Sequence, residues 1–484
     1  MYSHRSLTLL FGFLTWTTTL SAQTYFSRHY GEDTDNGKAL VQTDDGGFMT
    51  LGSLDDGTSQ ATQLQLNRFN ATGDLLWTKH YGSADLDLPS GMIRTKNGTL
   101  ILCGTRTIPW GPPNAGDVYL ICTDMAGKVL WETHFGKASG AAFISQVMET
   151  PDEALVAVGT AVPPGGDPQN FIAKLSNDGA LIWEKTFGQS NKAEELYDVV
   201  MTPEGYYAMA GYITPKIDKA DVVLTITDTS GQVLSTTYYA SGKTDKARAL
   251  LSLTGGGFLL AGDQSESGSN TRVLLIRTNP DGDTLWQRRY PIPGRYTTAY
   301  DAVEVPGQGF VMTGVIKFAP NVVGHRVYLL HVDYEGNLLW EREFEIEPPN
   351  GLQTSSAGNA LIRTTDGGFA ITGDWFNGVR KELILIKTNA AGIVSTRETA
   401  ITPAVRLYPN PVERELVLTS EALAGAIRAD FFTPAGQLVL SETFSSGQQT
   451  ITLTLPKGIA SGLYTLVLYD RLGSFYREQV VVSR

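Results

Sequence analysis

The chain has 484 residues, of which 42% are hydrophobic and 18% are charged, so it can bury a large core and is long enough for two or three domains. Its 50 acidic residues outnumber its 38 basic ones, which gives a net charge of -12. This balance argues against a nucleic-acid partner and against binding to an anionic membrane surface.

Residues 1–22 have the pattern of a signal peptide. A basic start precedes an apolar and hydroxylated stretch from Leu7 to Leu20, and small residues follow up to Ala22. We therefore expect export, with cleavage between Ala22 and Gln23. The alternative is an N-terminal membrane anchor, but the apolar run is short and rich in threonine for that role. No later stretch is apolar enough to span a bilayer, so we expect no transmembrane segment in the mature chain.

From residue 23 to residue 396 the sequence repeats every 51 to 59 residues. In each copy a bulky apolar residue is followed four positions later by glycine. The pairs are Phe48/Gly52, Leu100/Gly104, Leu155/Gly159, Tyr207/Gly211, Phe258/Gly262, Phe310/Gly314 and Phe369/Gly373. A glycine that recurs within a strand often marks a close approach of two backbone segments.

One copy contains four short strands, separated by turns of Gly, Asn and Asp. They are Leu75–Gly82, Met92–Arg94, Thr99–Gly104 and Val118–Thr123. Four strands in a repeat of this length are typical of a propeller blade. The predicted fold class is therefore all-β, a seven-bladed β-propeller over residues 23–396. A solenoid has a shorter period, and helical repeats would show a period of 3.6 residues.

A closed ring needs one chain end to supply the outer strand of the last blade. The segment Thr24–Gly31 (TYFSRHYG) matches the outer strand Leu76–Gly82 (LWTKHYG), whereas Val394–Ala400 lacks both the Trp and the Tyr-Gly of that strand. We predict that the N-terminal strand closes the ring and thereby ties down that end of the chain.

The period stops near residue 397. Residues 397–404 have the composition of a linker, and residues 405–484 contain six predicted strands spaced as in a small antiparallel β-sandwich. The motifs in this segment are Tyr408-Pro409-Asn410-Pro411, Ala435-Gly436-Gln437 and the Gly462-Leu463-Tyr464 that precedes an apolar strand.

Together and in this order, these motifs resemble the type A sorting domain of the type IX secretion system. The resemblance implies a Bacteroidetes-type bacterium, the type IX secretion machinery as partner, and export to the cell surface or the medium, usually with removal of the domain. The alternative is an ordinary adhesive sandwich. The repeats also resemble the Thr-x-Asp-Gly-Gly-Phe copies common in such secreted proteins, seen at Thr365–Phe369. That likeness implies a propeller but no activity.

The sequence predicts no catalytic residue, no metal site and no cofactor. His29, His80 and His134 occupy one repeat position, which lies far apart around a ring, so no single metal could join them. The Asp-Gly and Asn-Gly turns lack the ligand order of calcium loops and fit hairpins. The spacing of Cys122–Trp131 is similar to the tryptophan-docking motif of quinoprotein dehydrogenases, but those enzymes need a cofactor pocket, and we find no adjacent-cysteine pair and no metal-carboxylate constellation.

Two further patterns leave alternatives open. Basic residues recur five positions before a turn glycine: Arg68, Lys174, Arg277 and Lys387. They could form a ligand surface, but we favour the alternative that they form salt bridges between strands. Cys103 and Cys122 lie in neighbouring predicted strands, where they form either a cross-strand disulfide or two buried thiols.

The loops offer Trp110 and Trp375 as candidate ligand contacts, and the alternative for both is a packed anchor. The sequence therefore predicts a secreted or cell-surface, non-catalytic propeller that binds a glycan or a surface protein. The alternative function is a secreted propeller enzyme, a glycan hydrolase or lyase. That function requires acidic or histidine side chains to converge on one rim or in the channel.

Overall fold

The computed structural model describes most of the chain. The described residues are 25–31, 34–55, 62–82, 86–107, 116–136, 140–215, 219–265, 271–290, 295–318, 324–346, 354–394, 406–419, 428–433, 438–444, 450–470 and 473–483. Within them every regular element is a strand, and no helix of a length and apolarity that could cross a bilayer occurs. The predicted signal cleavage between Ala22 and Gln23 and the candidate Trp110 lie outside the described residues.

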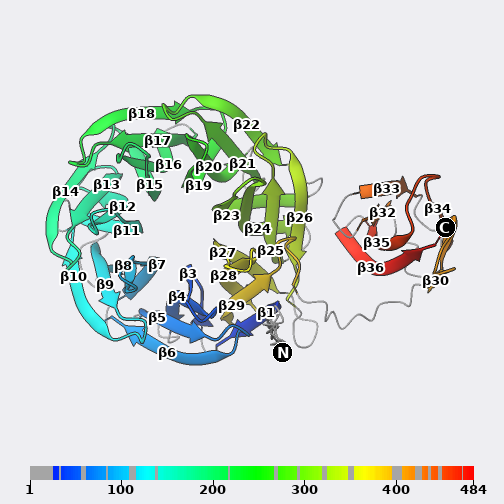
Figure 1. Ribbon diagram of the computed structural model, residues 1–484. Helices are drawn as coiled ribbons and strands as arrows, with labels where there is room; N and C mark the ends of the chain where they lie inside the picture. Colours follow the sequence, from blue (N-terminus) through cyan, green and yellow to red (C-terminus); the bar gives the residue numbers. More distant parts are fainter. Residues whose placement is uncertain are drawn as a thin grey trace, which may run out of the picture. The chain divides into compact units, whose positions relative to one another are not determined.

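The chain divides into two compact units, Met1–Val394 and Ser395–Arg484. In the described part of the first unit, five antiparallel sheets of four strands and one sheet of nine strands surround a central opening, with one strand of each four-stranded group nearest the centre (Figure 1). This arrangement is a β-propeller, as the repeat predicts.

The innermost strands are β3 (Ala39–Gln42), β7 (Leu86–Arg94), β11 (Ala141–Glu149), β15 (Lys192–Met201), β19 (Thr244–Ser252), β23 (Arg295–Val305) and β27 (Ser355–Arg363). The second strands are β4 (Phe48–Asp55), β8 (Leu100–Thr107), β12 (Leu155–Val162), β16 (Tyr207–Pro215), β20 (Phe258–Ser265), β24 (Gly309–Phe318) and β28 (Phe369–Phe376).

The third strands are β5 (Thr62–Phe69), β9 (Gly116–Thr123), β13 (Gln169–Leu175), β17 (Asp221–Thr227), β21 (Thr271–Thr278), β25 (His325–Val332) and β29 (Lys381–Thr388). The outermost strands are β6 (Leu75–Tyr81), β10 (Val129–Phe135), β14 (Leu181–Phe187), β18 (Val233–Tyr239), β22 (Thr284–Tyr290), β26 (Leu338–Phe344) and β1 (Phe26–Tyr30). One parallel pair, Thr62 with Leu86, joins the β3–β6 and β7–β10 groups, and the short β2 (Thr34–Asp35) pairs with β4.

The N-terminal strand closes the ring. Strand β1 pairs antiparallel with β29, in a register that runs from Phe26 opposite Lys387 to Tyr30 opposite Leu383. The prediction that an N-terminal strand supplies the missing outer position is therefore confirmed. Val394 packs against the core of this last blade, and the rest of the rival segment, 395–400, lies outside the described residues.

The recurring glycine sits where two backbones nearly touch. In the inner strands the register shifts by one residue beside this glycine, as it does between Leu196 and Asp198 opposite Gly211. A Cβ atom at the recurring positions would lie only 1.6 to 2.6 Å from a carbonyl oxygen of the preceding inner segment. Any larger residue would have to push the bulged strand away, which explains the repeat and confirms the predicted close approach.

Neighbouring blades are joined through the outermost strands. The Trp77 ring packs on Gly127 in a turn of the next blade, and the Tyr81 hydroxyl donates to the Gly127 carbonyl at 2.7 Å. Gly127 has a φ of 72°, a conformation that favours glycine. The same ring-on-glycine contact recurs for Trp131, Trp183, Trp286 and Trp340. The tryptophan of the repeat is therefore a joint between blades.

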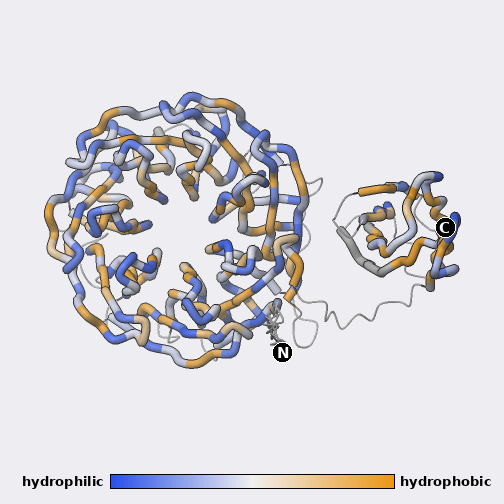
Figure 2. Tube along the Cα trace, viewed as in Figure 1, coloured by the Kyte–Doolittle hydropathy of each residue, from blue (hydrophilic) through white to orange (hydrophobic). Residues whose placement is uncertain are grey.

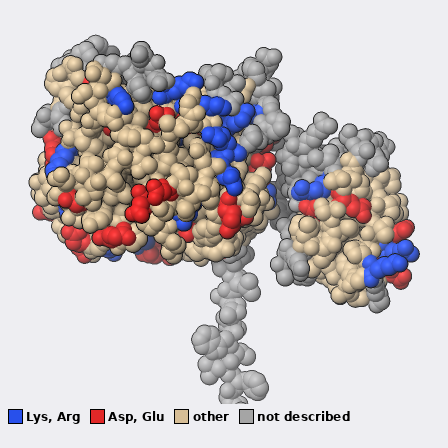
Figure 3. All heavy atoms as spheres, turned by 90° about the horizontal axis from the view of Figure 1, so that it is seen from above, with Lys and Arg blue, Asp and Glu red and all other residues tan. Residues whose placement is uncertain are grey.

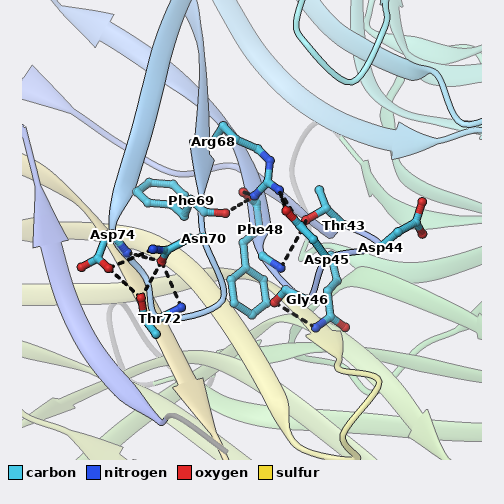
Figure 4. Close-up of polar contacts among 12 residues, drawn as sticks. Thr43, Asp44, Asp45, Gly46, Phe48, Arg68, Phe69, Asn70, Thr72 and Asp74 are labelled. Atoms are coloured by element: carbon cyan, nitrogen blue, oxygen red, sulfur yellow. Dashed lines mark hydrogen bonds and ion pairs between the residues drawn. The ribbon is translucent and has the colours of Figure 1, made fainter. Parts of the chain in front are cut away.

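The turns at one side of the ring are short and regular. On this side the innermost strand of each blade connects to the second strand, and, except in the last blade, the third strand connects to the outermost strand. Asn70 shows how: its side-chain oxygen accepts hydrogen bonds from the backbone nitrogens of Thr72 and Asp74 (Figure 4). We call this side the turn rim. Its turns are rich in Asp and Glu, and Figure 3 shows acidic side chains gathered toward the lower edge of the propeller and basic ones toward the upper edge.

The hydrophobic core lies between blades rather than at the centre of the ring. One buried cluster combines Val118 and Leu120 from one blade with Ala157 and Phe171 from the next. Figure 2 shows the same separation, with hydrophobic residues within the blades and hydrophilic ones around the opening. The inner strands are therefore available for polar contacts with a ligand.

The second unit, Ser395–Arg484, contains two antiparallel sheets that share one buried core, which includes Phe431, Leu453 and Leu466. The first sheet consists of β30 (Arg406–Tyr408), β31 (Glu415–Thr419) and β34 (Thr450–Thr454). The second consists of β33 (Leu438–Thr443), β32 (Arg428–Phe432), β35 (Gly462–Asp470) and β36 (Gly473–Val482).

Candidate functional site in the central channel

Bulges in the inner strands β7, β11, β15, β19, β23 and β27 each place one extra residue beside the channel. Halfway along β15 the extra residue is Tyr197, and the neighbouring side chain on the second strand is Tyr212, directly after the recurring glycine. The two rings stack with centroids 5.9 Å apart. A bulge is a common device for aiming a side chain at a site.

We call each such couple a channel pair: the bulged residue and the residue after the recurring glycine. The pairs are Ser90/Thr105, Ser145/Thr160, Tyr197/Tyr212, Arg248/Asp263, Tyr300/Val315 and Asn359/Asp374. Two of them are joined by hydrogen bonds, from Arg248 Nε to Asp263 Oδ1 at 2.8 Å and from Asn359 Nδ2 to Asp374 Oδ1 at 2.9 Å.

The channel pairs differ sharply around the ring. The β7 and β11 blades present small hydroxyl side chains. The β15 blade presents two tyrosines, the β19 blade presents Arg248, and the β23 blade presents Tyr300. The Arg248 guanidinium lies between blades, 5.7 Å from the centroid of the Tyr197 ring and 5.4 Å from that of Tyr300. These distances are those of cation–π contacts.

More polar groups extend this half of the channel. The Lys246 ammonium lies 3.9 Å from the centroid of the Tyr212 ring, and the Tyr197 hydroxyl donates to Glu195 Oε2 at 3.1 Å. Tyr197, Arg248 and Tyr300 are all partly exposed. The site therefore offers aromatic faces next to donors and acceptors, an arrangement that suits the rings and hydroxyls of a sugar.

Electrostatics keep the central cation charged. Burial disfavours the charge on Arg248, but the Asp263 carboxylate and its hydrogen bond outweigh this effect, so the pKa of the guanidinium lies above its usual value. Burial raises the pKa of Tyr300, and the nearby Arg248 charge partly offsets that rise. Both tyrosines beside Arg248 are therefore neutral hydrogen-bonding groups at physiological pH.

Two carboxyl groups follow bulged tyrosines and link neighbouring blades. Asp198 accepts a hydrogen bond from Leu250 N at 2.8 Å, and Asp301 accepts one from Leu361 N at 2.7 Å. Removal from water raises the pKa of Asp198 to about 7, with a contribution from the charge of Asp301, and raises the pKa of Asp301 to about 6. Such shifts mark candidate acids, although the backbone bonds also give both residues a structural role.

Trp375 is not a ligand contact. Its side chain is 1% exposed and packs in the core of the last blade, with the His29 ring 4.5 Å away. Of the two alternatives that the sequence leaves open for Trp375, the structure shows the packed anchor, because His29 on the N-terminal strand covers the ring. His29 Nδ1 also pairs with Glu382 Oε2 at 2.5 Å.

The other sequence candidates have structural roles. The basic column forms salt bridges to carboxylates in the turns, as we favoured, for Arg68, Lys174 and Lys387. Cys103 and Cys122 are both buried free thiols, so the disulfide alternative is wrong. His80 contacts Gln65, and the His134 ring stacks on Tyr119 with centroids 4.3 Å apart. Among the described residues, no group of His, Cys, Asp and Glu could hold a metal ion.

The sequence reasoning missed the channel pairs, although a signal existed. The bulged residues all lie fourteen positions before the recurring glycine, a column that reads Ser90, Ser145, Tyr197, Arg248, Tyr300 and Asn359, with Lys38 at the same offset in the β3–β6 group. Its variability in an otherwise regular repeat would have singled it out.

No known sequence family and no curated protein matches the chain. Solved structures that it resembles include Sqt1 of Chaetomium thermophilum, bound to the N-terminus of ribosomal protein L10, with 11% identity, a TM-score of 0.44 and coverage of 75% of this chain and 98% of that one. The Pan2 WD40 domain of Neurospora crassa has 12% identity, a TM-score of 0.43 and coverage of 75% and 98%.

An α-L-arabinofuranosidase of Fusarium graminearum has 8% identity, a TM-score of 0.40 and coverage of 76% of this chain and 99% of that one. These neighbours are β-propellers with and without catalytic activity. Likeness at this level concerns the fold and says nothing of a ligand or a reaction.

Proposed function

We propose that the protein is a secreted or cell-surface, non-catalytic β-propeller of seven blades that binds a glycan in its channel. The count of seven treats the β3–β6 and β7–β10 groups, which share one hydrogen-bonded pair of strands, as two blades. The observation that carries the proposal is the uneven channel: three tyrosines and an arginine occupy positions that hold serine and threonine on the opposite side.

The lining favours a glycan over a protein. Tyr197, Tyr212 and Tyr300 supply flat apolar faces, and Arg248 and Asp263 supply a donor and an acceptor beside them. Sugars bind through this combination of stacking and hydrogen bonding, whereas the centre of a protein interface is more apolar and depleted of charge.

A glycan array with the purified protein tests the proposal, followed by titration of each glycan that binds. Arg248→Ala and Tyr300→Ala should each weaken binding at least about tenfold, or ~1.4 kcal/mol, because they remove central contacts. Ser145→Ala is the matched control at the same repeat position, and it should change affinity less than about twofold. Thermal unfolding confirms that each variant is folded.

Two results would contradict the proposal: no glycan bound by the wild-type protein, or equal losses in Arg248→Ala and Ser145→Ala. If a protein from the same surface binds instead, and Arg248→Ala abolishes that binding, the channel keeps its role and the ligand class changes.

The second candidate function is a glycan hydrolase or lyase, because Asp198 and Asp301 have raised pKa values beside the proposed glycan site. Such an enzyme would release new reducing ends or unsaturated sugars from a bound glycan. Its rate would fall as pH rises above about 6 to 7, where the acid form is lost. Asp301→Asn would remove this activity, whereas a binding module releases no product at any pH.

We further propose that residues 405–484 are a β-sandwich that acts as the export signal of the type IX secretion system. Two motif residues support this because they contact other strands of the unit. Asn410 Oδ1 accepts a hydrogen bond from Val481 N at 2.8 Å, and the Tyr464 ring stacks on Phe431 with centroids 5.3 Å apart. Tyr408, Pro409 and Pro411 are exposed, so the secretion machinery could contact them.

Truncation after residue 404 tests this export role in the source bacterium. The truncated protein should accumulate in the periplasm in a folded form, and the secreted wild-type protein should end near residues 397–405 by mass spectrometry. Normal export of the truncated form, or a mature protein that still ends at Arg484, would overturn the assignment.

A further inference from the structure

At the turn rim, three blades each contain an internal ion pair between a basic side chain and a turn carboxylate. In the β3–β6 group, Arg68 reaches from β5 beneath the turn that follows β3, where its Nη2 pairs with Asp45 Oδ2 at 2.5 Å (Figure 4). Lys174 pairs in the same way with Asp152 at 3.5 Å, and Lys387 with Asp366 at 2.8 Å. In these blades the basic side chain fills the space beneath the turn.

The β7–β10 blade lacks both partners. Cys122 stands where the basic side chain would be, and Asn97 stands at the position of the turn carboxylate. A cavity of about 160 Å³ lies there, between this blade and the next, and Asn97 and Cys122 line it. The short side chain of Cys122 leaves unfilled the volume that an arginine or lysine occupies elsewhere.

Two carboxylates from the neighbouring blade also line the cavity. Glu149 Oε2 accepts a hydrogen bond from Lys96 N at 2.8 Å, and Glu153 Oε2 accepts one from Asn97 Nδ2 at 3.0 Å. The Lys96 ammonium donates to the Thr150 carbonyl at 3.1 Å. Glu149, Glu153 and Lys96 together carry one net negative charge, and the surrounding turn rim is also acidic.

Glu153 occupies a position at which five other blades carry glycine. Its φ is 63°, and the corresponding glycines, all with positive φ, are Gly46, Gly98, Gly205, Gly256 and Gly367, whereas Gln308 holds the position in the β23–β26 blade. A side chain is strained in this conformation, yet this turn alone places a carboxylate there.

The aromatic wall of the cavity lacks a second repeat cation. Elsewhere the residue two positions after the tryptophan covers its ring: Lys79 lies 5.4 Å from the Trp77 centroid, Lys185 lies 5.6 Å from that of Trp183, and Arg342 lies 5.1 Å from that of Trp340. After Trp131, which lines the cavity, the corresponding residue is Thr133.

We propose that this cavity binds a basic side chain, lysine or arginine, of a partner polypeptide. The incoming cation takes the place of the missing internal one: its alkyl stem packs beside Trp131 and its charged head lies near Glu149 and Glu153. A protonated amine or guanidinium suits an aromatic wall next to carboxylates, because it gains both a cation–π contact and charge-assisted hydrogen bonds. The acidic turn rim attracts a basic partner over longer distances. This site is distinct from the channel and does not depend on the proposed glycan binding.

The test uses two small probes and the purified protein with ¹⁵N-labelled tryptophan. Nα-acetyl-lysine N-methylamide should shift the indole N–H resonance of Trp131, which Trp131→Phe assigns, with a dissociation constant of about a millimolar. The norleucine analogue has nearly the same shape but no charge, and it should produce no saturable shift. Raising the salt concentration should weaken binding of the lysine probe.

Variants should locate the interaction. Asn97→Asp with Cys122→Lys rebuilds the Asp366–Lys387 pair inside this blade, so it should reduce probe affinity at least tenfold without lowering the melting temperature. If that double variant fails to fold, Glu153→Gln serves the same purpose through loss of one carboxylate. Glu204→Gln, at the equivalent turn of the next blade, is the matched control and should leave affinity unchanged.

The proposal is overturned if the lysine probe leaves the Trp131 resonance unmoved, if the norleucine analogue binds equally well, or if refilling or neutralising the cavity leaves probe affinity unaltered. Arg248→Ala separates the two sites, because it should weaken glycan binding in the channel at least about tenfold while the lysine probe still shifts Trp131.

Discussion

The outermost and the innermost strands of the propeller differ in what the repeat preserves. Along the outer strands, tryptophan, tyrosine and the turn glycine recur because most blades make a similar joint with their neighbour. Along the inner strands, the bulge and the recurring glycine are kept, but the side chain that the bulge presents changes from serine to tyrosine to arginine. Positions that repeat hold the ring together, and positions that vary within the same frame are where a ligand can be recognised.

The N-terminal strand gives the strongest test of the outer joints. Deleting residues 24–31 removes the pairing with β29, the buried Phe26 and the hydrogen bond from Tyr30 to Gly73. Loss of the two aromatic side chains alone should cost at least about 3 kcal/mol, and the exposed edge should promote aggregation. Urea unfolding and light scattering measure the two effects.

The control for this deletion removes residues 395–400, the rival segment at the other end of the repeat region. It should change the free energy of unfolding by less than about 0.5 kcal/mol. Equal destabilisation by the two deletions would show that the N-terminal strand does not hold the ring closed.

Glycine substitutions in one blade test the close backbone approach at the recurring glycine. At Gly262 a Cβ would lie 2.0 Å from the Lys246 carbonyl oxygen, so Gly262→Ala should destabilise the protein by about 3 kcal/mol. At Gly255 no atom lies within 4 Å of a Cβ, and the backbone there does not require glycine. Gly255→Ala should therefore be neutral or stabilise by up to about 1 kcal/mol. Similar midpoints of denaturation for the two variants would contradict the close approach.

The strands, the repeat and the closure could be predicted because they depend on residues that recur at fixed offsets. The channel pairs could not be predicted in the same way, because the bulge inserts one residue and breaks the alternation that tells which side chain faces inward. For Trp375 the sequence left a ligand contact and a packed anchor open for a different reason: the residue that covers the ring, His29, is distant in sequence and reaches it only when the ring closes. The cavity beside Cys122 became visible only when equivalent blades could be compared atom by atom.

The smallest expected change in stability comes from removing one hydrogen bond at either of two joints between outermost strands. The Tyr239 hydroxyl donates to the Gly282 carbonyl at 2.7 Å, and the Tyr290 hydroxyl donates to the Gly336 carbonyl at 2.8 Å. At the second joint the Trp286 ring also packs on the glycine, whereas at the first joint Ser235 replaces the tryptophan. Each Tyr→Phe change leaves a carbonyl without its donor, at a cost of about 1 kcal/mol.

Tyr239→Phe should cost more than Tyr290→Phe, because its bond is buried and no tryptophan shares the joint. Because the two bonds have nearly equal lengths, the difference between the two free energies of unfolding reports the combined effect of burial and of the tryptophan at the joint. If Tyr290→Phe proves the more costly change, the tyrosine bond and the tryptophan contact reinforce one another, and the outer joint acts as one cooperative unit rather than as two separate contacts.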